Sequence, residues 1–154
     1  MTDFDDIRSN LYRKGYPLLG WGSGRKVYDL KNGYVVKVAK NNRGIEQNKA
    51  EHHLAELDQQ GIFAKVESIS DDNRYLIMEK ATPIRSFAEV WRYYEVRNHV
   101  QLFSLDKFQD LSKKYDLLNA DLRRRSSWGL VNGKPVIIDF GFTRAVRNFY
   151  MHGR

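Results

Sequence analysis

The spacing of apolar residues changes along the chain, and each change predicts a different element. Over residues 3–14 apolar positions recur every three or four residues, which is typical of a short amphipathic helix that Asp3 can cap. Strands are predicted next: two within residues 18–30 around a glycine-rich turn, one over residues 34–40, and two over residues 63–69 and 75–79. A helix over residues 44–60 is predicted between the third and fourth strands.

The second half of the chain is predicted to be mostly helical until a final hairpin. Residues 81–83 interrupt the pattern and are expected to form a linker. Residues 84–118 carry two stripes of large apolar side chains at helical spacing, which are most simply explained as core. Two further apolar runs flank the turn Asn132-Gly133, a strong hairpin signal.

Composition limits the partners, the cysteine chemistry and the cellular location that can be expected of the protein. The formal net charge of +7 favours polyanionic partners, although the basic residues are spread along the chain and solubility explains them equally well. There is no cysteine, which removes disulfides and thiolate chemistry. No apolar run approaches the ~20 residues of a membrane span. The acidic start of the chain is unlike a signal peptide, so we expect a cytoplasmic protein without a membrane partner.

Three glycines, Gly20, Gly22 and Gly24, stand at alternate positions in the first predicted turn. Without β-carbons, such a turn can approach a ligand and direct several backbone N–H groups at phosphate oxygens. A hairpin with a flexible glycine tip explains the same residues. The turn neither opens a helix nor ends in Gly-Lys-Ser/Thr, which excludes the Rossmann and P-loop arrangements.

Lys37 is out of place on the third predicted strand. With a period of two it shares a face with apolar neighbours such as Ala39, so its ammonium group needs a partner. A phosphate or a carboxylate would serve, and Glu51 is the best placed glutamate of the following helix, ahead of Glu46 and Glu56. A lysine that snorkels from an edge strand is the alternative.

Asp139 stands at the end of the apolar run Val136–Ile138, and Gly141 lets the backbone turn away two residues later. A carboxylate held rigidly at a strand end suits a hard divalent cation. An ordinary strand that ends in Asp-x-Gly is equally consistent with this motif taken alone.

The order of these features resembles the protein-kinase-like family over about residues 18–144. The features are the glycine-rich hairpin, the strand lysine, the helix glutamate, a strand ending at Met78-Glu79, Asp121, and Asp139-Phe140-Gly141. Asp121 and Asp139 are eighteen residues apart, as the catalytic-loop and metal-binding aspartates of that family commonly are.

The resemblance implies an α+β, two-lobed fold in a single domain over residues 1–154. The N-lobe, residues 1–80, would hold the N-terminal helix, five antiparallel strands and one main helix. Residues 81–154 would form a truncated, mostly helical C-lobe. A minimal bacterial or phage kinase-like protein is the nearest resemblance.

The resemblance also implies roles for individual residues. Lys37 would contact the α- and β-phosphates of ATP while Glu51 holds it, Asp139 would bind Mg²⁺, and Asp121 would orient the substrate hydroxyl. The remaining nucleotide contacts would come from Gly20, Gly22 and Gly24 over the phosphates, Val27 and Ala39 around adenine, Met78 behind it, and the backbone of Glu79 and Ala81.

Three departures from the family pattern bear on activity. Arg25 stands where the third glycine would fall, which predicts a reshaped phosphate cover. Ser126 replaces the metal-binding asparagine, and its hydroxyl can also ligate Mg²⁺; a gap shifted by one residue would align Ser127 instead, and both alignments stay open. Only thirteen residues follow Gly141, so we expect the C-lobe helices to keep an apolar face that a second copy or a partner protein can cover.

Three classes of function remain open from the sequence. The first is an ATP- and Mg²⁺-dependent phosphotransferase acting on a protein or small-molecule hydroxyl, with Arg123, Arg124 and Arg125 attracting an acidic substrate. The second is a pseudokinase that serves as a nucleotide- or partner-binding regulatory module. The third, nucleic-acid binding through the arginine clusters, is the least favoured, because helical periodicity explains the aromatic residues beside them as core.

Overall fold

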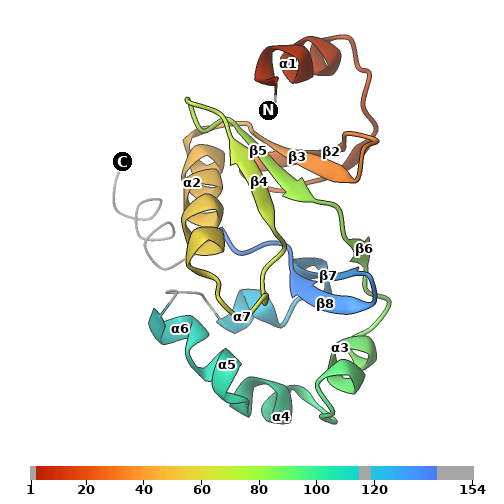
Figure 1. The fold of residues 1–154 in the computed structure, drawn as a ribbon, viewed down its shortest axis with the longest axis vertical. Coiled ribbons are helices and arrows are strands. Elements are labelled where there is room, and N and C mark those ends of the chain that lie inside the picture. Colours follow the sequence, from red (N-terminus) through yellow and green to blue (C-terminus); the bar gives the residue numbers. More distant parts are fainter. Residues whose placement is uncertain (1–2, 115–118, 142–154) are drawn as a thin grey trace.

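Five antiparallel strands form the larger sheet of the computed structural model, which describes residues 3–114 and 119–141 (Figure 1). The strands are β1 (Leu18–Trp21), β2 (Arg25–Asp29), β3 (Tyr34–Ala39), β4 (Val66–Ile69) and β5 (Tyr75–Glu79), in the spatial order β1-β2-β3-β5-β4. The predicted strands are confirmed, the fourth with a later start. Asn32-Gly33 lies in the β2–β3 turn, where Gly33 has a φ of 90°, in the left-handed region that glycine favours.

One helix covers each face of this sheet. α1 (Phe4–Tyr12) packs on the face that contains Val36 of β3. α2 (Asn42–Leu57) packs on the other face, where Leu54 joins the main core. Because successive side chains of a strand point to opposite faces, Lys37 lies on the α2 side of the sheet.

A smaller sheet of three strands lies below the first one in Figure 1. It consists of β6 (Thr82–Pro83), β7 (Trp128–Val131) and β8 (Lys134–Ile137). The predicted linker at residues 81–83 is therefore wrong, because Thr82 and Pro83 pair with Leu130 and Gly129 of β7. The local sequence pattern could not predict this pairing, since the partner residues of Thr82 and Pro83 lie more than forty positions further along the chain.

β8 also ties the two lobes together. The N–H of Ile137 donates to the carbonyl of Ile62, and its carbonyl accepts from the N–H of Ala64, both at 2.9 Å. Phe63, between them in sequence, stacks on Phe140 with ring centroids 4.4 Å apart. The segment after α2 thus fixes the backbone just before Asp139.

Residues 84–114 form four short helices instead of the two longer ones that the apolar stripes predicted. These are α3 (Ala88–Tyr93), α4 (His99–Ser104), α5 (Asp106–Gln109) and α6 (Leu111–Lys114). The first break follows from Glu95, whose φ of 59° is left-handed, and from Asn98, whose side chain accepts the N–H of Gln101 and so starts α4. Predicted helical residues 115–118 lie outside the described residues.

Two short turns of helix lead from there to the final hairpin. They are α7 (Asn119–Leu122) and the 3-10 turn η1 (Arg125–Ser127). Trp128, 1% exposed, follows η1, and its indole N–H donates to the carbonyl of Leu122 at 2.7 Å. Phe87 and Phe108 pack around its ring with centroids 6.3 and 6.0 Å away, so the apolar stripes are core, as predicted.

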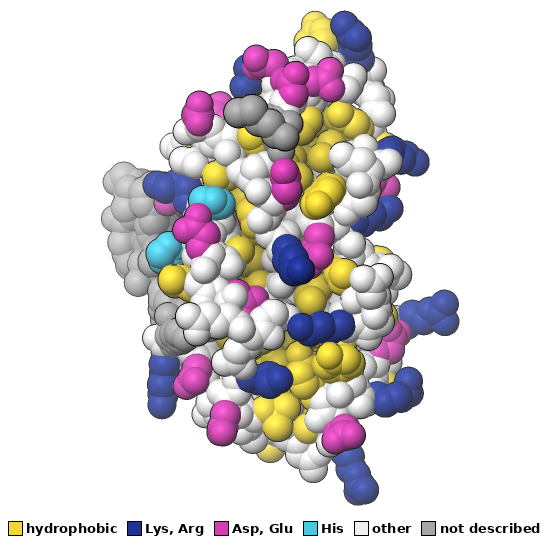
Figure 2. Space-filling model, in the orientation of Figure 1, with side chains coloured by type: hydrophobic (Ala, Val, Ile, Leu, Met, Phe, Trp, Pro, Cys, Tyr) yellow, Lys and Arg dark blue, Asp and Glu magenta, His cyan; other side chains and the backbone are white. Residues whose placement is uncertain are grey.

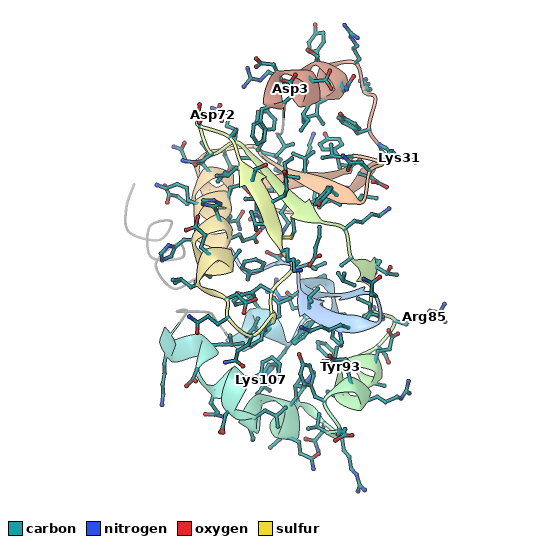
Figure 3. The ribbon with its side chains drawn as sticks, viewed as in Figure 1. Asp3, Lys31, Asp72, Arg85, Tyr93 and Lys107 are labelled. Atoms are coloured by element: carbon teal, nitrogen blue, oxygen red, sulfur yellow. The ribbon has the colours of Figure 1, made fainter. Side chains whose placement is uncertain are left out.

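The surface is mixed in charge. Figure 2 shows Lys and Arg side chains distributed along the length of one face with Asp and Glu between them, in keeping with basic residues spread along the sequence. Figure 3 shows Asp3 and Asp72 at one end of the molecule and Tyr93 and Lys107 at the other. Within residues 3–114 and 119–141, no helix has the length and apolarity needed to cross a membrane.

Candidate functional site

A buried ion pair joins β3 to α2. The Nζ of Lys37 lies 2.8 Å from Oε1 of Glu51, and the two residues are 5% and 0% exposed. The predicted pairing is therefore confirmed. Glu46 and Glu56 lie nearer the surface, since their side chains are 31% and 64% exposed.

Arg25, at the start of β2, enters the same cluster. Its guanidinium makes a bidentate contact with Glu51, from Nη1 to Oε1 at 2.9 Å and from Nη2 to Oε2 at 2.7 Å. Nη1 also donates to Oδ1 of Asn48 at 3.1 Å. One buried carboxylate of α2 thus holds two cations from two neighbouring strands.

Asp139 meets this cluster from the other lobe. Its Oδ1 lies 3.2 Å from Nη2 of Arg25, and its side chain is 53% exposed, so Asp139 is fixed by its backbone more than by burial. Oε2 of Glu51 accepts the backbone N–H groups of Phe140 at 3.1 Å and Gly141 at 2.9 Å. Lys37 donates to the carbonyl of Ile138. The segment 138–141 is therefore held against β3 and α2.

Burial and charge act in opposite directions on these groups. Burial alone would raise the pKa of Glu51, but the charges of Arg25 and Lys37 and their hydrogen bonds outweigh it and lower the pKa to about 2. Burial likewise opposes the charge of Arg25, yet Glu51 and Asp139 raise its pKa. For Lys37, burial and the nearby Arg25 together lower the pKa despite Glu51. Glu51 is therefore the charge on which the cluster depends.

The glycine-rich turn has an open part and a packed part. A β-carbon added at Gly20 or Gly22 would meet no atom within 4 Å, so their backbone is free to approach a ligand. At Gly24 it would lie 2.4 Å from Oε1 of Gln47 on α2, so Gly24 is needed for the approach of β2 to that helix. Trp21, between the two open glycines, is 72% exposed.

The apolar side chains predicted to surround adenine come from β2, β3 and β5. Val27 pairs with Lys37 on β3, and Met78 is buried, 1% exposed, beside Val35. Ala39 lies at the far end of β3, where its Cβ would be 2.9 Å from a β-carbon added at Gly44 of α2. The predicted adenine contacts of Val27, Ala39 and Met78 stay predictions.

The backbone predicted to hydrogen-bond adenine, at Glu79 and Ala81, already makes contacts within the protein. The backbone N–H of Glu79 donates to the carbonyl of Lys65 at 2.9 Å. Ala81 packs closely on β7, because a β-carbon added at Gly129 would lie 2.6 Å from that of Ala81. The residues are where a connection between the two lobes should be, and their predicted role stays a prediction.

The predicted catalytic loop is a short helix followed by a basic turn. Asp121 lies in α7, with Oδ1 3.7 Å from Nη2 of Arg124. Ser127 is buried, 3% exposed, and its hydroxyl donates to the carbonyl of Asp121 at 2.6 Å. Ser126 is exposed. Of the two serines, Ser126 therefore has the more accessible hydroxyl.

Arg25 was missed as a site residue, although the sequence held a signal for it. Arg25 and Val27 are two positions apart on β2, so they share a face, and the register sets Arg25 opposite Ala39 and Val27 opposite Lys37. An arginine at a position where the kinase-like pattern has glycine, on the face of Lys37, was a second inward cation in need of a carboxylate.

These features define a protein-kinase-like fold with two lobes: the five-stranded sheet, the helix whose glutamate pairs with the β3 lysine, and the Asp139-Phe140-Gly141 segment against that helix. Among solved structures, the chain is similar to the gentamicin complex of the aminoglycoside phosphotransferase APH(2")-IIa, with 19% identity and a TM-score of 0.50 over 92% of this chain and 71% of that one. It also matches the streptomycin-ATP-APH(2")-IIa ternary complex, with 17% identity and a TM-score of 0.49 over 92% and 73%. No family model and no curated protein matches the chain. At these identities the likeness is one of fold.

The donor set fits a nucleotide that brings its own metal ion. Lys37 and Arg25 could offer cations to phosphate oxygens, and the backbone of Gly20 and Gly22 is open enough to approach them. No group of three metal-ligating side chains gathers in the part of the chain that the structure describes. Mg²⁺ is commonly held by one or two carboxylates together with substrate phosphates, and Asp139 can supply such an oxygen.

Proposed function

We propose that the protein is an ATP-dependent phosphotransferase that acts on the hydroxyl group of a small molecule or a protein. The observation that carries this proposal is the buried Lys37–Glu51 pair, at 2.8 Å, with Glu51 also accepting the N–H of Gly141. Such a lysine is a cation held in one position beside an open glycine turn. That arrangement suits the binding of a phosphate chain, where positioning and charge compensation provide most of the catalysis.

Each half of the site has a separate task in this proposal. Bound ATP would supply the phosphoryl group, with Mg²⁺ to offset its charge. Lys37 binds phosphate oxygens, and Glu51 keeps its ammonium group from turning away. Asp139 supplies the carboxylate oxygen for the metal. Asp121 would orient the acceptor hydroxyl and take its proton as the oxygen bonds to the γ-phosphorus of ATP, and ADP would leave with the bridging oxygen of the broken P–O bond.

Turnover with labelled ATP tests this proposal. We expect the protein with Mg²⁺ to hydrolyse ATP or phosphorylate itself, and Lys37→Ala and Asp139→Asn each to lower the rate by at least about 100-fold. Lys37→Ala should still fold, because Arg25 continues to neutralise Glu51. Lys40→Ala removes an exposed lysine three residues further along the chain and is the matched control. Equal rates for the wild type and both variants would contradict the proposal.

A regulatory module that binds nucleotide without turnover is the second candidate. It is favoured by the contact of Arg25 with Asp139 at 3.2 Å, which engages the carboxylate proposed for the metal, and by a serine, Ser126 or Ser127, where the kinase-like pattern has the metal-binding asparagine. A raised melting temperature with ATP, combined with no turnover in the same preparation, would favour this candidate.

A further inference from the structure

We propose that Arg25 is a fixed cation of the phosphate site that makes nucleotide binding less dependent on Mg²⁺, an inference that rests on the function proposed above. The guanidinium group lies among Glu51, Asn48 and Asp139. It contributes the charge that a metal ion would otherwise have to supply alone.

Buried partners hold the guanidinium group of Arg25, and one of its four hydrogen bonds can be replaced by a bond to another acceptor. Its contacts with Asn48 at 3.1 Å and Glu51 at 2.9 and 2.7 Å involve groups that are 0% exposed. Its contact with Asp139, at 3.2 Å, is the longest of the four, and the Asp139 side chain is 53% exposed. A phosphate oxygen can therefore take over this Nη2 donor while the other three bonds keep the guanidinium in place.

The charge balance of the cluster explains why nucleotide binding would depend less on Mg²⁺ when Arg25 is present. Lys37, Glu51 and Asp139 alone would leave one negative charge in excess, which attracts a divalent cation. Arg25 balances that charge. A cation beside Asp139 makes this carboxylate a weaker ligand for Mg²⁺, and it gives the phosphates a partner that needs no metal.

The backbone around Arg25 is shaped for this position. Gly24 comes so close to α2 that an added β-carbon would lie 2.9 Å from the N of Gly44, and one added at Gly44 would lie 2.0 Å from the carbonyl O of Gly24. Small residues at both places let the start of β2 approach the helix. The arginine side chain can then span the remaining distance to Glu51.

Calorimetric titration with ADP tests the inference, in EDTA and in millimolar Mg²⁺. We expect the wild-type Kd to differ by less than about tenfold between the two conditions. Arg25→Gln should weaken metal-free binding by about tenfold or more and enlarge the ratio of the two Kd values, whereas Arg25→Lys should stay nearer the wild type. Lys26→Gln makes the same change of charge at the next, exposed residue of β2 and should leave the ratio unchanged.

Asp139→Asn provides a second arm that keeps Arg25 intact. Removing the carboxylate frees Nη2 for phosphate, so metal-free ADP should bind several-fold more tightly than to the wild type. If Arg25→Gln has the same ratio of Kd values in EDTA and Mg²⁺ as the wild type, the inference is overturned while the proposed function stands. If Arg25→Gln proves unfolded in a melting curve, unchanged metal-free ADP binding by Asp139→Asn overturns the inference in the same way. Absence of ADP binding by every variant in both conditions would overturn the proposed function as well.

Discussion

The two halves of the candidate site differ in how the chain holds their charges. In the N-lobe, Glu51 is 0% exposed and carries Lys37 and Arg25 at hydrogen-bonding distance. In the C-lobe, Asp121 lies 3.7 Å from Arg124, whose side chain is 70% exposed. The carboxylate and both cations of the first set are buried, whereas the second set joins a carboxylate that is only 20% exposed to an arginine that lies in solvent, where salt screens its charge.

In the function proposed above, this difference would separate the binding of the phosphate chain from the selection of the acceptor. A buried cation that cannot move suits a ligand of constant shape, such as a phosphate chain. Exposed arginines on a short turn suit an acceptor that varies in shape and is attracted by charge. The comparison therefore predicts a large effect on folding from the loss of Glu51, the shared carboxylate of the N-lobe cluster, and small effects on folding from changes to the arginines of the C-lobe turn.

Glu51→Ala should have the largest effect, because it leaves two buried cations without their carboxylate. We expect a loss of about 3–5 kcal/mol in the free energy of unfolding, measured by urea denaturation. Glu46→Ala, on the same helix, removes a surface pair with Lys49 and should change stability by less than about 0.5 kcal/mol. Similar losses for the two variants would remove the distinction between fixed and exposed charges.

The pH dependence of stability sharpens the same comparison. The pKa of Glu51 falls to about 2 in the folded protein, so between its ordinary pKa and about 2 the unfolded chain binds the extra proton. The stabilisation by Glu51, on the order of 3 kcal/mol, is present above its ordinary pKa and is lost as the pH falls through this window.

Acid unfolding of the wild type and Glu51→Gln measures this contribution. The difference in stability between the two should be largest near neutral pH and shrink below the ordinary pKa of a glutamate, where position 51 of the unfolded wild type becomes protonated while Glu51 of the folded protein is still ionised. Glu56→Gln, at an exposed position of α2, controls for the general loss of carboxylates in acid. A difference that stays constant down to pH 3 would mean that Glu51 is not the charge that holds the cluster.

Local periodicity accounts for the part of the site that the sequence predicted. Lys37 faces inward because β3 alternates, and Glu51 lies on the buried side of α2, so both positions follow from residues close in sequence. The contact of Arg25 with Asp139 spans 114 positions and depends on how closely β2 approaches α2, which no local pattern encodes. The place of Arg25 on the inward face was predictable, and its partners were not.

The errors in the second lobe have a similar cause. Glu95 ends a helix with a left-handed φ of 59°, a conformation that glycine or asparagine would have signalled and glutamate does not. Thr82 and Pro83 become a strand only because Gly129 and Leu130 lie beside them. Apolar spacing predicted which side chains enter the core, and tertiary contacts decided where the elements begin and end.

Replacing Arg123, Arg124 and Arg125 together with alanine should have the smallest effect on folding. Arg123 lies over the ring of Phe103 at 5.4 Å and Arg125 donates to the carbonyl of Arg85 at 2.9 Å, both at the surface, so little stability is lost. For acceptors that carry carboxylate or phosphate groups, KM should rise by about five- to tenfold at low salt with kcat nearly unchanged, because these charges attract the acceptor before the reaction.

The triple replacement of Arg13, Lys14 and Lys31, which are exposed and outside the site, removes the same charge and should leave KM unchanged. A fall in kcat with constant KM would instead mean that the arginines act on the transition state, and the separation of a fixed phosphate site from an adjustable acceptor site would fail.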